Sequence, residues 1–134
     1  MTIPDDVRGL LDATNFAHIA TRMPDGAPHS VAIWIGTEGD RVAFFTQRGS
    51  RKGRNLAADP RVAISVVDRH NPYSTAWLRG RVVETRDEEG LPVVDAISLK
   101  YTGRPFPIRT VTLYLVEVDT AGSMSLPFEP PPDQ

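Results

Sequence analysis

The sequence predicts a mainly β protein in which six antiparallel strands form a closed or nearly closed barrel with short helices around it. Six segments carry the alternating or β-branched apolar pattern of strands. Turn-forming clusters, such as Pro24-Asp25-Gly26 and Glu38-Gly39-Asp40, separate neighbouring segments. Helical spacing of apolar residues is confined to three short stretches. The chain has 134 residues, 40% of them hydrophobic, which is the size and composition of one globular domain.

The first two expected strands form a hairpin, because only the turn at Pro24-Asp25-Gly26 and its flanking residues separate them. The fourth strand is rich in β-branched residues, which suits a stave of a barrel. Gly80 lies inside the fifth strand, where a glycine often marks a bend or a close backbone approach. The six expected strands cover residues 16–21, 29–35, 41–46, 62–67, 73–85 and 110–118.

Three short helices interrupt the strands. The first opens the chain, with Thr2 as a possible cap and Val7, Leu10 and Leu11 on one face. The second covers residues 50–59 and has Ser50 as its cap. The third covers residues 92–101, with a proline in its first turn and a glycine just past its end.

We expect one domain over residues 1–122, followed by a Pro-rich tail over residues 123–134. Four prolines fall within the tail, and strand alternation stops before it. The tail is therefore expected to be extended or disordered.

Composition excludes several classes of function. The chain has no cysteine, which removes thiolate nucleophiles, disulfide chemistry and cysteine-ligated metal centres. A net charge of −2 argues against a protein built to coat nucleic acid or an anionic membrane. No apolar run is long enough for a membrane span, and the first residues lack the pattern of a signal peptide. We therefore expect a cytoplasmic protein that binds neither nucleic acid nor membrane.

The densest local feature is a group of four cations in the segment from Arg48 to Arg54, at the start of the second helix. Free backbone N–H groups and the helix dipole favour an anion there, so the segment suits a phosphate. It matches neither a Walker A loop nor a Rossmann fingerprint. Two alternatives stay open, a solvated basic helix start and a nucleic-acid patch.

The remaining candidate residues carry weaker signals. His18 and His29 lie in adjacent hairpin strands, but no third ligand follows at metal spacing, so the histidines are expected to be structural or exposed. No Gly-x-Ser-x-Gly elbow supports a serine nucleophile. Aromatic residues are core or interface residues by default, yet some could wall a flat cofactor ring that supplies the chemistry. Those considered are Trp34, Phe44, Phe45, Tyr73 and Trp77.

A family resemblance rests on the order and spacing of several short motifs. In chain order these are Ala20-Thr21, Pro24-Asp25-Gly26-Ala27-Pro28-His29, a strand containing Trp34, Phe45-Thr46, residues 49–62 from Gly49-Ser50-Arg51-Lys52-Gly53-Arg54-Asn55 onward, Gly80-Arg81-Val82-Val83, and Lys100-Tyr101-Thr102-Gly103. With them the chain resembles the pyridoxamine 5′-phosphate oxidase-like split β-barrel family. It is most similar there to the small flavin- and deazaflavin-dependent oxidoreductases, which use coenzyme F-420 or FMN. The resemblance implies a six-stranded Greek-key split barrel and a homodimer with two cofactor sites at the interface.

Carried over by position, the resemblance assigns most site residues to the cofactor. Ser50 and Lys52 match the phosphate-contacting motif, with Arg51 and Arg54 as possible helpers. Trp77 and Arg79 match the strand that reaches the partner's cofactor. Arg79 and Tyr101 are candidates for orienting a substrate, and no catalytic residue or metal ligand is assigned. The residues beside the cofactor ring are Val31, Ala32, Ile33, Trp34, Phe45, Thr46 and Gln47.

The resemblance implies an oxidoreductase that moves a hydride between F-420 or FMN and a small conjugated substrate. The bias toward arginine over lysine, thirteen to two, hints at a high-GC bacterium and favours F-420. Vitamin B6 oxidation is not expected, because no C-terminal substrate-binding segment is recognised. The alternative is a flavin, F-420 or haem carrier without turnover, in which His18, His29 or His70 would have to ligate haem.

Overall fold

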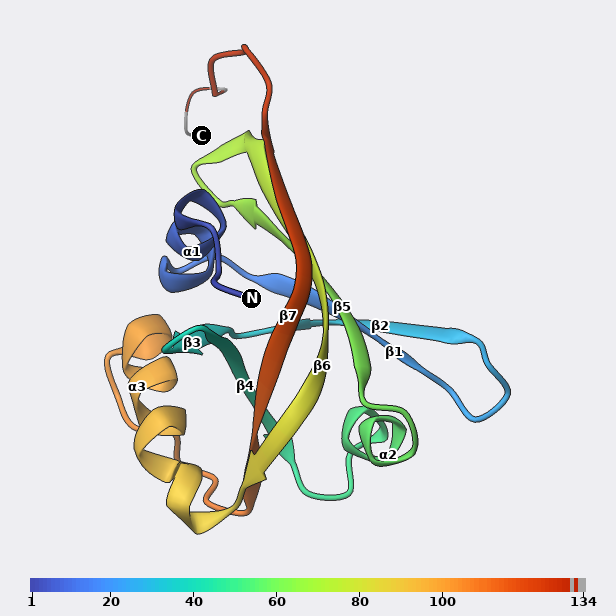
Figure 1. Cartoon of the computed structure of the whole chain (residues 1–134). Coiled ribbons are helices and arrows are strands. Elements are labelled where there is room, and N and C mark those ends of the chain that lie inside the picture. The colour runs from blue at the N-terminus through green and yellow to red at the C-terminus, as the bar shows by residue number, and fades with distance from the viewer. Residues whose placement is uncertain (131, 133–134) are drawn as a thin grey trace.

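A computed structural model describes residues 1–130 and 132 of the chain (Figure 1). It contains one antiparallel sheet, three α-helices and one short 3₁₀ helix. In chain order the elements are α1 (Asp5–Asp12), β1 (Ala17–Arg22), β2 (Pro28–Ile33), β3 (Gly36–Glu38), β4 (Arg41–Gln47), α2 (Arg51–Ala58), β5 (Arg61–Asp68), β6 (Asn71–Arg86), η1 (Glu88–Gly90), α3 (Leu91–Thr102) and β7 (Val111–Ser125).

The three predicted helices are present. Ser50 caps α2 as predicted, because its hydroxyl accepts a hydrogen bond from the Gly53 amide at 3.0 Å. Gly103 ends α3 with a φ of 76°, in the left-handed region that favours glycine. The predicted cap of α1 is wrong: Pro4, not Thr2, occupies the cap position, and no side chain makes a capping hydrogen bond there.

The sheet has seven strands in the described chain, in the order β2-β1-β5-β6-β7-β4-β3, and it is not closed. The prediction of six strands is therefore wrong in number, although the antiparallel β architecture is confirmed. The difference lies at residues 34–38: the strand expected over 29–35 ends at Ile33, and an additional strand forms at Gly36–Glu38, just before the predicted turn. The chain instead leaves β2 after Ile33, passes through Trp34 and Ile35, and enters β3 at Gly36.

The short link between β2 and β3 explains the shape of the sheet. These strands occupy opposite edges, yet only three Cα steps separate Ile33 from Gly36, a span of roughly 11 Å at most. The sheet must therefore curl until its two edges approach one another. Among the described residues no hydrogen-bonded ladder joins β2 to β3. The result is a barrel left open at Trp34.

The two longest strands are β6 and β7, which pair over most of their length. Within them Gly80 lies at a register shift, and a Cβ there would come within 2.2 Å of the Glu117 carbonyl oxygen, so the predicted close approach is confirmed. The tail was expected from Ser123, but β7 continues to Ser125 because residues 120–125 pair with the first half of β6. Residues 131, 133 and 134 of the predicted tail lie outside the described residues.

Two clusters of buried side chains hold the fold together. The larger fills the inside of the curled sheet and is covered by Val7, Leu10 and Leu11 of α1. The smaller lies between the sheet and α3, around Val94, Ile97 and a few strand residues. Half-buried aromatic residues extend the smaller cluster outward, toward the opening of the barrel.

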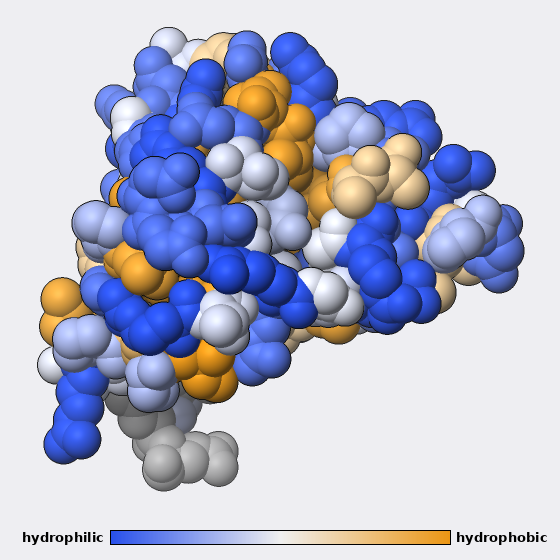
Figure 2. Space-filling view, turned by 90° about the horizontal axis from the view of Figure 1, so that it is seen from below, coloured by the Kyte–Doolittle hydropathy of each residue, from blue (hydrophilic) through white to orange (hydrophobic). Residues whose placement is uncertain are grey.

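Figure 2 shows the molecule from below, where hydrophilic side chains predominate and hydrophobic ones gather in a few separate patches. Among the described residues, no helix combines the length and apolar character needed to cross a bilayer.

Candidate functional site

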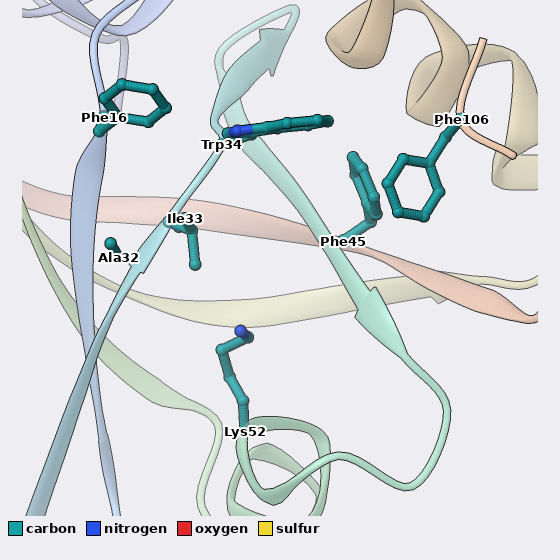
Figure 3. A pocket seen from close by; sticks show the side chains of 7 residues that line it. All are labelled: Phe16, Ala32, Ile33, Trp34, Phe45, Lys52 and Phe106. Carbon is teal, nitrogen blue, oxygen red and sulfur yellow. The ribbon is translucent and has the colours of Figure 1, made fainter. Parts of the chain in front are cut away.

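A cavity of about 400 Å³ lies at the opening of the barrel, and we call it the Lys52 cavity (Figure 3). Its volume is within the range of small-molecule and cofactor sites. Lys52 reaches into it from the start of α2, while Trp34 lies at the opposite end. Its walls combine the end of β2, the β2–β3 link, β4 and the loop after α3. The lining residues are Phe16, Ala32, Ile33, Trp34, Phe45, Lys52 and Phe106.

Three aromatic rings form a rigid wall of the cavity. Trp34 meets Phe45 and Phe106 edge-on, with ring centroids 6.3 Å and 6.0 Å apart. Phe45 and Phe106 also pack edge to face, with ring centroids 4.8 Å apart. Such edge-to-face pairs are favourable beyond the area they bury. All three rings pack on the buried cluster beneath α3, which fixes their positions.

Tyr101 supports this wall from behind and is not among the lining residues. Its ring stacks on Trp34, with centroids 5.3 Å apart, and on Phe16. Its hydroxyl donates to the Asn15 carbonyl oxygen and accepts from the Ile35 amide at 3.2 Å. Burial raises the pKa of this hydroxyl. Because both functions of the hydroxyl are occupied by backbone, the geometry favours a structural role over the predicted role in orienting substrate.

Lys52 is the charged residue of the cavity. It is half-buried, and burial lowers the pKa of its ammonium group below the usual value of 10.5. No carboxylate of the described residues lies within ion-pair distance of it. A cation that is partly desolvated and unpaired is stabilised when an anion binds beside it.

The four predicted cations of the segment 48–54 do not act together. Arg48 lies within ion-pair distance of Asp87, at 3.4 Å, and of Glu88, at 3.3 Å. Arg51 and Arg54, like Lys52, have no carboxylate partner in the described part of the chain. The start of α2 therefore keeps three unpaired cations beside the positive end of a helix, as an anion site requires.

The other predicted site residues are more dispersed. The Thr46 hydroxyl donates to the Ser50 hydroxyl at 3.0 Å and so braces the cap of α2. Gln47 is exposed at the end of β4, and Val31 packs against the larger buried cluster. Of the ring-contacting residues predicted, the structure brings Ala32, Ile33, Trp34 and Phe45 into the Lys52 cavity, and it leaves Val31, Thr46 and Gln47 outside it.

Trp77 and Arg79 line a different hollow, on the outer face of the sheet, which we call the sheet hollow. Trp77 is 44% exposed, and the Arg79 guanidinium lies 5.2 Å from the centroid of its ring. Neither residue lines the Lys52 cavity of its own chain. Across the sheet the hollow is floored by small residues, Ala20, Ser30, Ala63 and Ser65.

The histidines do not converge. His18 lies opposite Ala32, and His29 lies opposite Thr21, so the two are three positions apart along the hairpin. His70 is exposed in the turn between β5 and β6. Within residues 1–130 and 132, no three His, Cys, Asp or Glu side chains gather as a metal site requires. No histidine lines the Lys52 cavity.

Sequence reasoning missed Phe16 and Phe106. Phe16 directly precedes β1, and Phe106 is half-buried in the loop 103–109, whose other residues are exposed. The Asp95 carboxylate holds this loop, accepting from the Phe106 amide at 3.2 Å and from the two terminal guanidinium nitrogens of Arg109 at 2.7 and 3.0 Å. A lone aromatic between two prolines was the available signal for Phe106.

Residues 3–112 match a protein-family model described as pyridoxamine 5′-phosphate oxidase. A search of curated protein sequences finds no significant match.

Similar solved structures agree with the family model in fold. One is named as an F-420 reductase: it is 27% identical, the match covers 90% of this chain and 98% of that one, and the TM-score is 0.80. A conserved hypothetical protein from Mycobacterium tuberculosis is 19% identical over 99% of this chain and 94% of its own, with a TM-score of 0.80. A putative pyridoxamine 5′-phosphate oxidase from Lactobacillus delbrueckii is 11% identical over 90% of this chain and 93% of its own, with a TM-score of 0.66.

Proposed function

Because the chain belongs to the pyridoxamine 5′-phosphate oxidase family, we propose that it is an oxidoreductase whose Lys52 cavity binds a phosphorylated flavin-type cofactor. We further propose that this cofactor is coenzyme F-420 in preference to FMN. The observation that carries the proposal is Lys52 itself, a half-buried cation with no carboxylate partner in the described part of the chain, which faces a cavity walled by aromatic rings.

The residues present fit both parts of such a cofactor. A phosphate is suited to the start of α2, where Arg51, Lys52 and Arg54 have no carboxylate partner among the described residues. The Ser50 side chain and carbonyl accept from the Gly53 and Arg54 amides, so the backbone N–H groups open to an anion there are those of Arg51 and Lys52. A flat ring is suited to the wall made by Trp34, Phe45 and Phe106. Few polar groups line that wall, so water is poorly accommodated beside a bound ring.

When bound, a reduced deazaflavin or flavin would supply the hydride for a conjugated acceptor, whose reduction also requires one proton. This chain contributes binding and placement. Lys52 holds the phosphate, the aromatic wall fixes the plane of the ring, and the same wall keeps water from it. Lys52 is the only titratable residue lining the cavity in the described chain, and it holds the phosphate. We therefore assign the proton to solvent.

The choice of F-420 is supported by the 27% identity to a structure named as an F-420 reductase, which extends over 90% of this chain. FMN offers a phosphate and a flat ring as well, so the cavity alone does not separate the two. Titration of the purified protein with each cofactor, followed by fluorescence, tests the choice. We expect F-420 to bind at least tenfold more tightly, and tighter binding of FMN would overturn that part of the proposal.

Lys52→Ala tests the site. Loss of one hydrogen bond to a charged group costs about 1.5–3 kcal/mol, so the dissociation constant should rise about 10- to 150-fold. Arg69→Gln is the matched control, since Arg69 is exposed and also lacks a carboxylate partner among the described residues. Equal dissociation constants for Lys52→Ala and the unmodified protein would exclude this cavity as the phosphate site.

A carrier without turnover would show the same binding. The two are distinguished by mixing the protein, with reduced cofactor bound, with a panel of enones and quinones. Oxidation of the cofactor that depends on both protein and acceptor supports the oxidoreductase. Binding without oxidation by any acceptor would favour the carrier.

We also propose that the protein acts as a homodimer with a second copy seated on the sheet hollow. Two rows of side chains cross this face: Ser30, Ala20, Ala63 and Arg79 in one, and Ala32, His18, Ser65 and Trp77 in the other. Ala32 also lines the Lys52 cavity, so the face continues into the cofactor site. Trp77, which is 44% exposed, and Arg79 are residue types enriched at protein interfaces, and they support contact with another chain here.

Light scattering tests the dimer. Ala63→Arg places a long cation in the floor of the sheet hollow and should give a monomer with weakened cofactor binding. Leu99→Glu is the control, because Leu99 is 50% exposed on α3, away from the sheet hollow. A dimer that survives Ala63→Arg unchanged would refute this interface.

A further inference from the structure

A second cavity, of about 420 Å³, adjoins the Lys52 cavity, and we call it the outer cavity. Trp34 and Phe106 line both cavities, so these two rings form a partition between them. Pro105 and Pro107 flank Phe106 and line the outer cavity as well. Its walls are therefore two aromatic rings and two proline rings, flat apolar surfaces that favour a planar ligand.

The polar groups of the outer cavity come from α3 and the loop after it. Ser98 and Thr102 line it, but the Ser98 hydroxyl already donates to the Arg104 carbonyl oxygen at 2.7 Å, and the Thr102 hydroxyl donates to the Ser98 carbonyl oxygen at 2.8 Å. The Thr102 hydroxyl also accepts from the Arg104 amide at 3.1 Å. These contacts fix the backbone of Arg104 at the edge of the cavity and leave neither hydroxyl directed to a ligand.

The Arg104 side chain is the polar group that stays available. Among the described residues its guanidinium has no ion-pair partner, whereas Arg109, five residues later, forms an ion pair with Asp95 through two hydrogen bonds. A guanidinium binds a carboxylate through two parallel hydrogen bonds. An unpaired guanidinium beside flat apolar walls is the donor set that recognises an aromatic or conjugated carboxylate.

We propose that the outer cavity is a binding site for a planar organic carboxylate, with Arg104 holding the carboxylate and Trp34 and Phe106 contacting the ring. Trp34 and Phe106 stand between the two cavities, whereas hydride transfer needs the reacting atoms about 3–3.5 Å apart, so we assign the outer cavity a binding role and not that of the hydride-accepting site. The binding does not depend on a cofactor. Phe106 then separates a ligand of the outer cavity from one in the Lys52 cavity.

The test uses 2-naphthoate and its neutral analogue 2-naphthamide, titrated by calorimetry into the protein without cofactor. We expect naphthoate to bind at least tenfold more tightly than the amide. Arg104→Gln should remove that preference, with a loss of about tenfold in naphthoate affinity and little change for the amide. Arg104→Lys, which keeps the charge but not the paired donors, should fall between the two.

Two control variants keep the result specific. Arg69→Gln, at an exposed and unpaired arginine elsewhere, should leave naphthoate binding unchanged, and so should Lys52→Gln. Equal affinity for naphthoate and the amide would overturn the proposal, as would unchanged binding in Arg104→Gln. Loss of naphthoate binding in Lys52→Gln, or competition by F-420, would place the carboxylate in the Lys52 cavity instead. Failure of both F-420 and FMN to bind would refute the proposed function and leave the naphthoate result intact.

Discussion

Two helical glycines, Gly9 in α1 and Gly53 in α2, allow one substitution to be tested in two surroundings. Neither has a positive φ, so alanine fits the backbone at both. An added Cβ at Gly9 meets nothing within 4 Å. At Gly53 it would lie 2.9 Å from the Tyr114 hydroxyl oxygen and 3.3 Å from the Ser50 hydroxyl oxygen. The two substitutions should therefore change stability in opposite directions.

The expected magnitudes follow from propensity and packing. Replacing glycine by alanine inside a helix stabilises by about 0.5–1 kcal/mol, and Gly9→Ala should show that gain. Overpacking a tight contact costs about 1–3 kcal/mol. Tyr114 cannot move away easily, because it is only 9% exposed and stacks on Phe44 with centroids 5.2 Å apart. We expect Gly53→Ala to destabilise by about 1 kcal/mol, since an overpacking cost of about 2 kcal/mol exceeds a propensity gain of about 0.75 kcal/mol.

Urea denaturation of both variants gives the comparison directly, since the midpoint shifts at constant slope report stability. Gly53→Ala should also weaken F-420 binding, because the helix start that carries Lys52 must shift to relieve the contact. Gly9→Ala should bind F-420 normally. Stabilisation of Gly53→Ala equal to that of Gly9→Ala would show that α2 does not pack against Tyr114 as described.

Three further predictions concern titration and support. Burial lowers the pKa of Lys52 below 10.5, so F-420 affinity should fall as the pH rises through that pKa and the ammonium group loses its charge. Lys52→Arg keeps its charge and should bind F-420 independently of pH between 7 and 10. Burial lowers the pKa of Lys100 to about 8 in the folded protein, so between pH 8 and 10 the unfolded state binds more protons than the folded state. The free energy of unfolding should therefore rise over this pH range. Urea midpoints should show a smaller rise for Lys100→Met. Tyr101→Phe leaves buried backbone groups of Asn15 and Ile35 with fewer partners and should cost about 1–2 kcal/mol by the same assay, while F-420 affinity changes less than threefold.

Much of the fold was predictable because strands and caps depend on local patterns. Alternation located six of the seven strands, and Ser50 was identified as a cap from its place before a basic helix. The missed strand follows from a non-local cause. Ile33-Trp34-Ile35 is a continuous apolar run, so nothing local shows that the chain changes pairing partners there. The extension of β7 to Ser125 has the same origin, since pairing with β6 overrides a sequence with weak strand propensity.

The site was predictable where its residues lie on regular elements. Ile33, Trp34 and Phe45 were identified from strand positions and from the resemblance, and Lys52 from the cationic motif. Phe106 was not, because a loop places it and Asp95, eleven residues earlier, accepts a hydrogen bond from its amide. No periodicity encodes such a contact, so it becomes visible only in three dimensions.

Charge pairing identifies the cations that are already engaged, which composition alone cannot do. Eight of the thirteen arginines form ion pairs in the described chain. With seventeen acidic residues available, the lack of partners at Arg51, Lys52 and Arg54 is not a shortage of carboxylates. Three neighbouring cations repel one another, and the helix dipole adds to that repulsion. Binding of an anion at the start of α2 must therefore relieve an unfavourable interaction, and its stabilising effect should weaken as salt screens the charges.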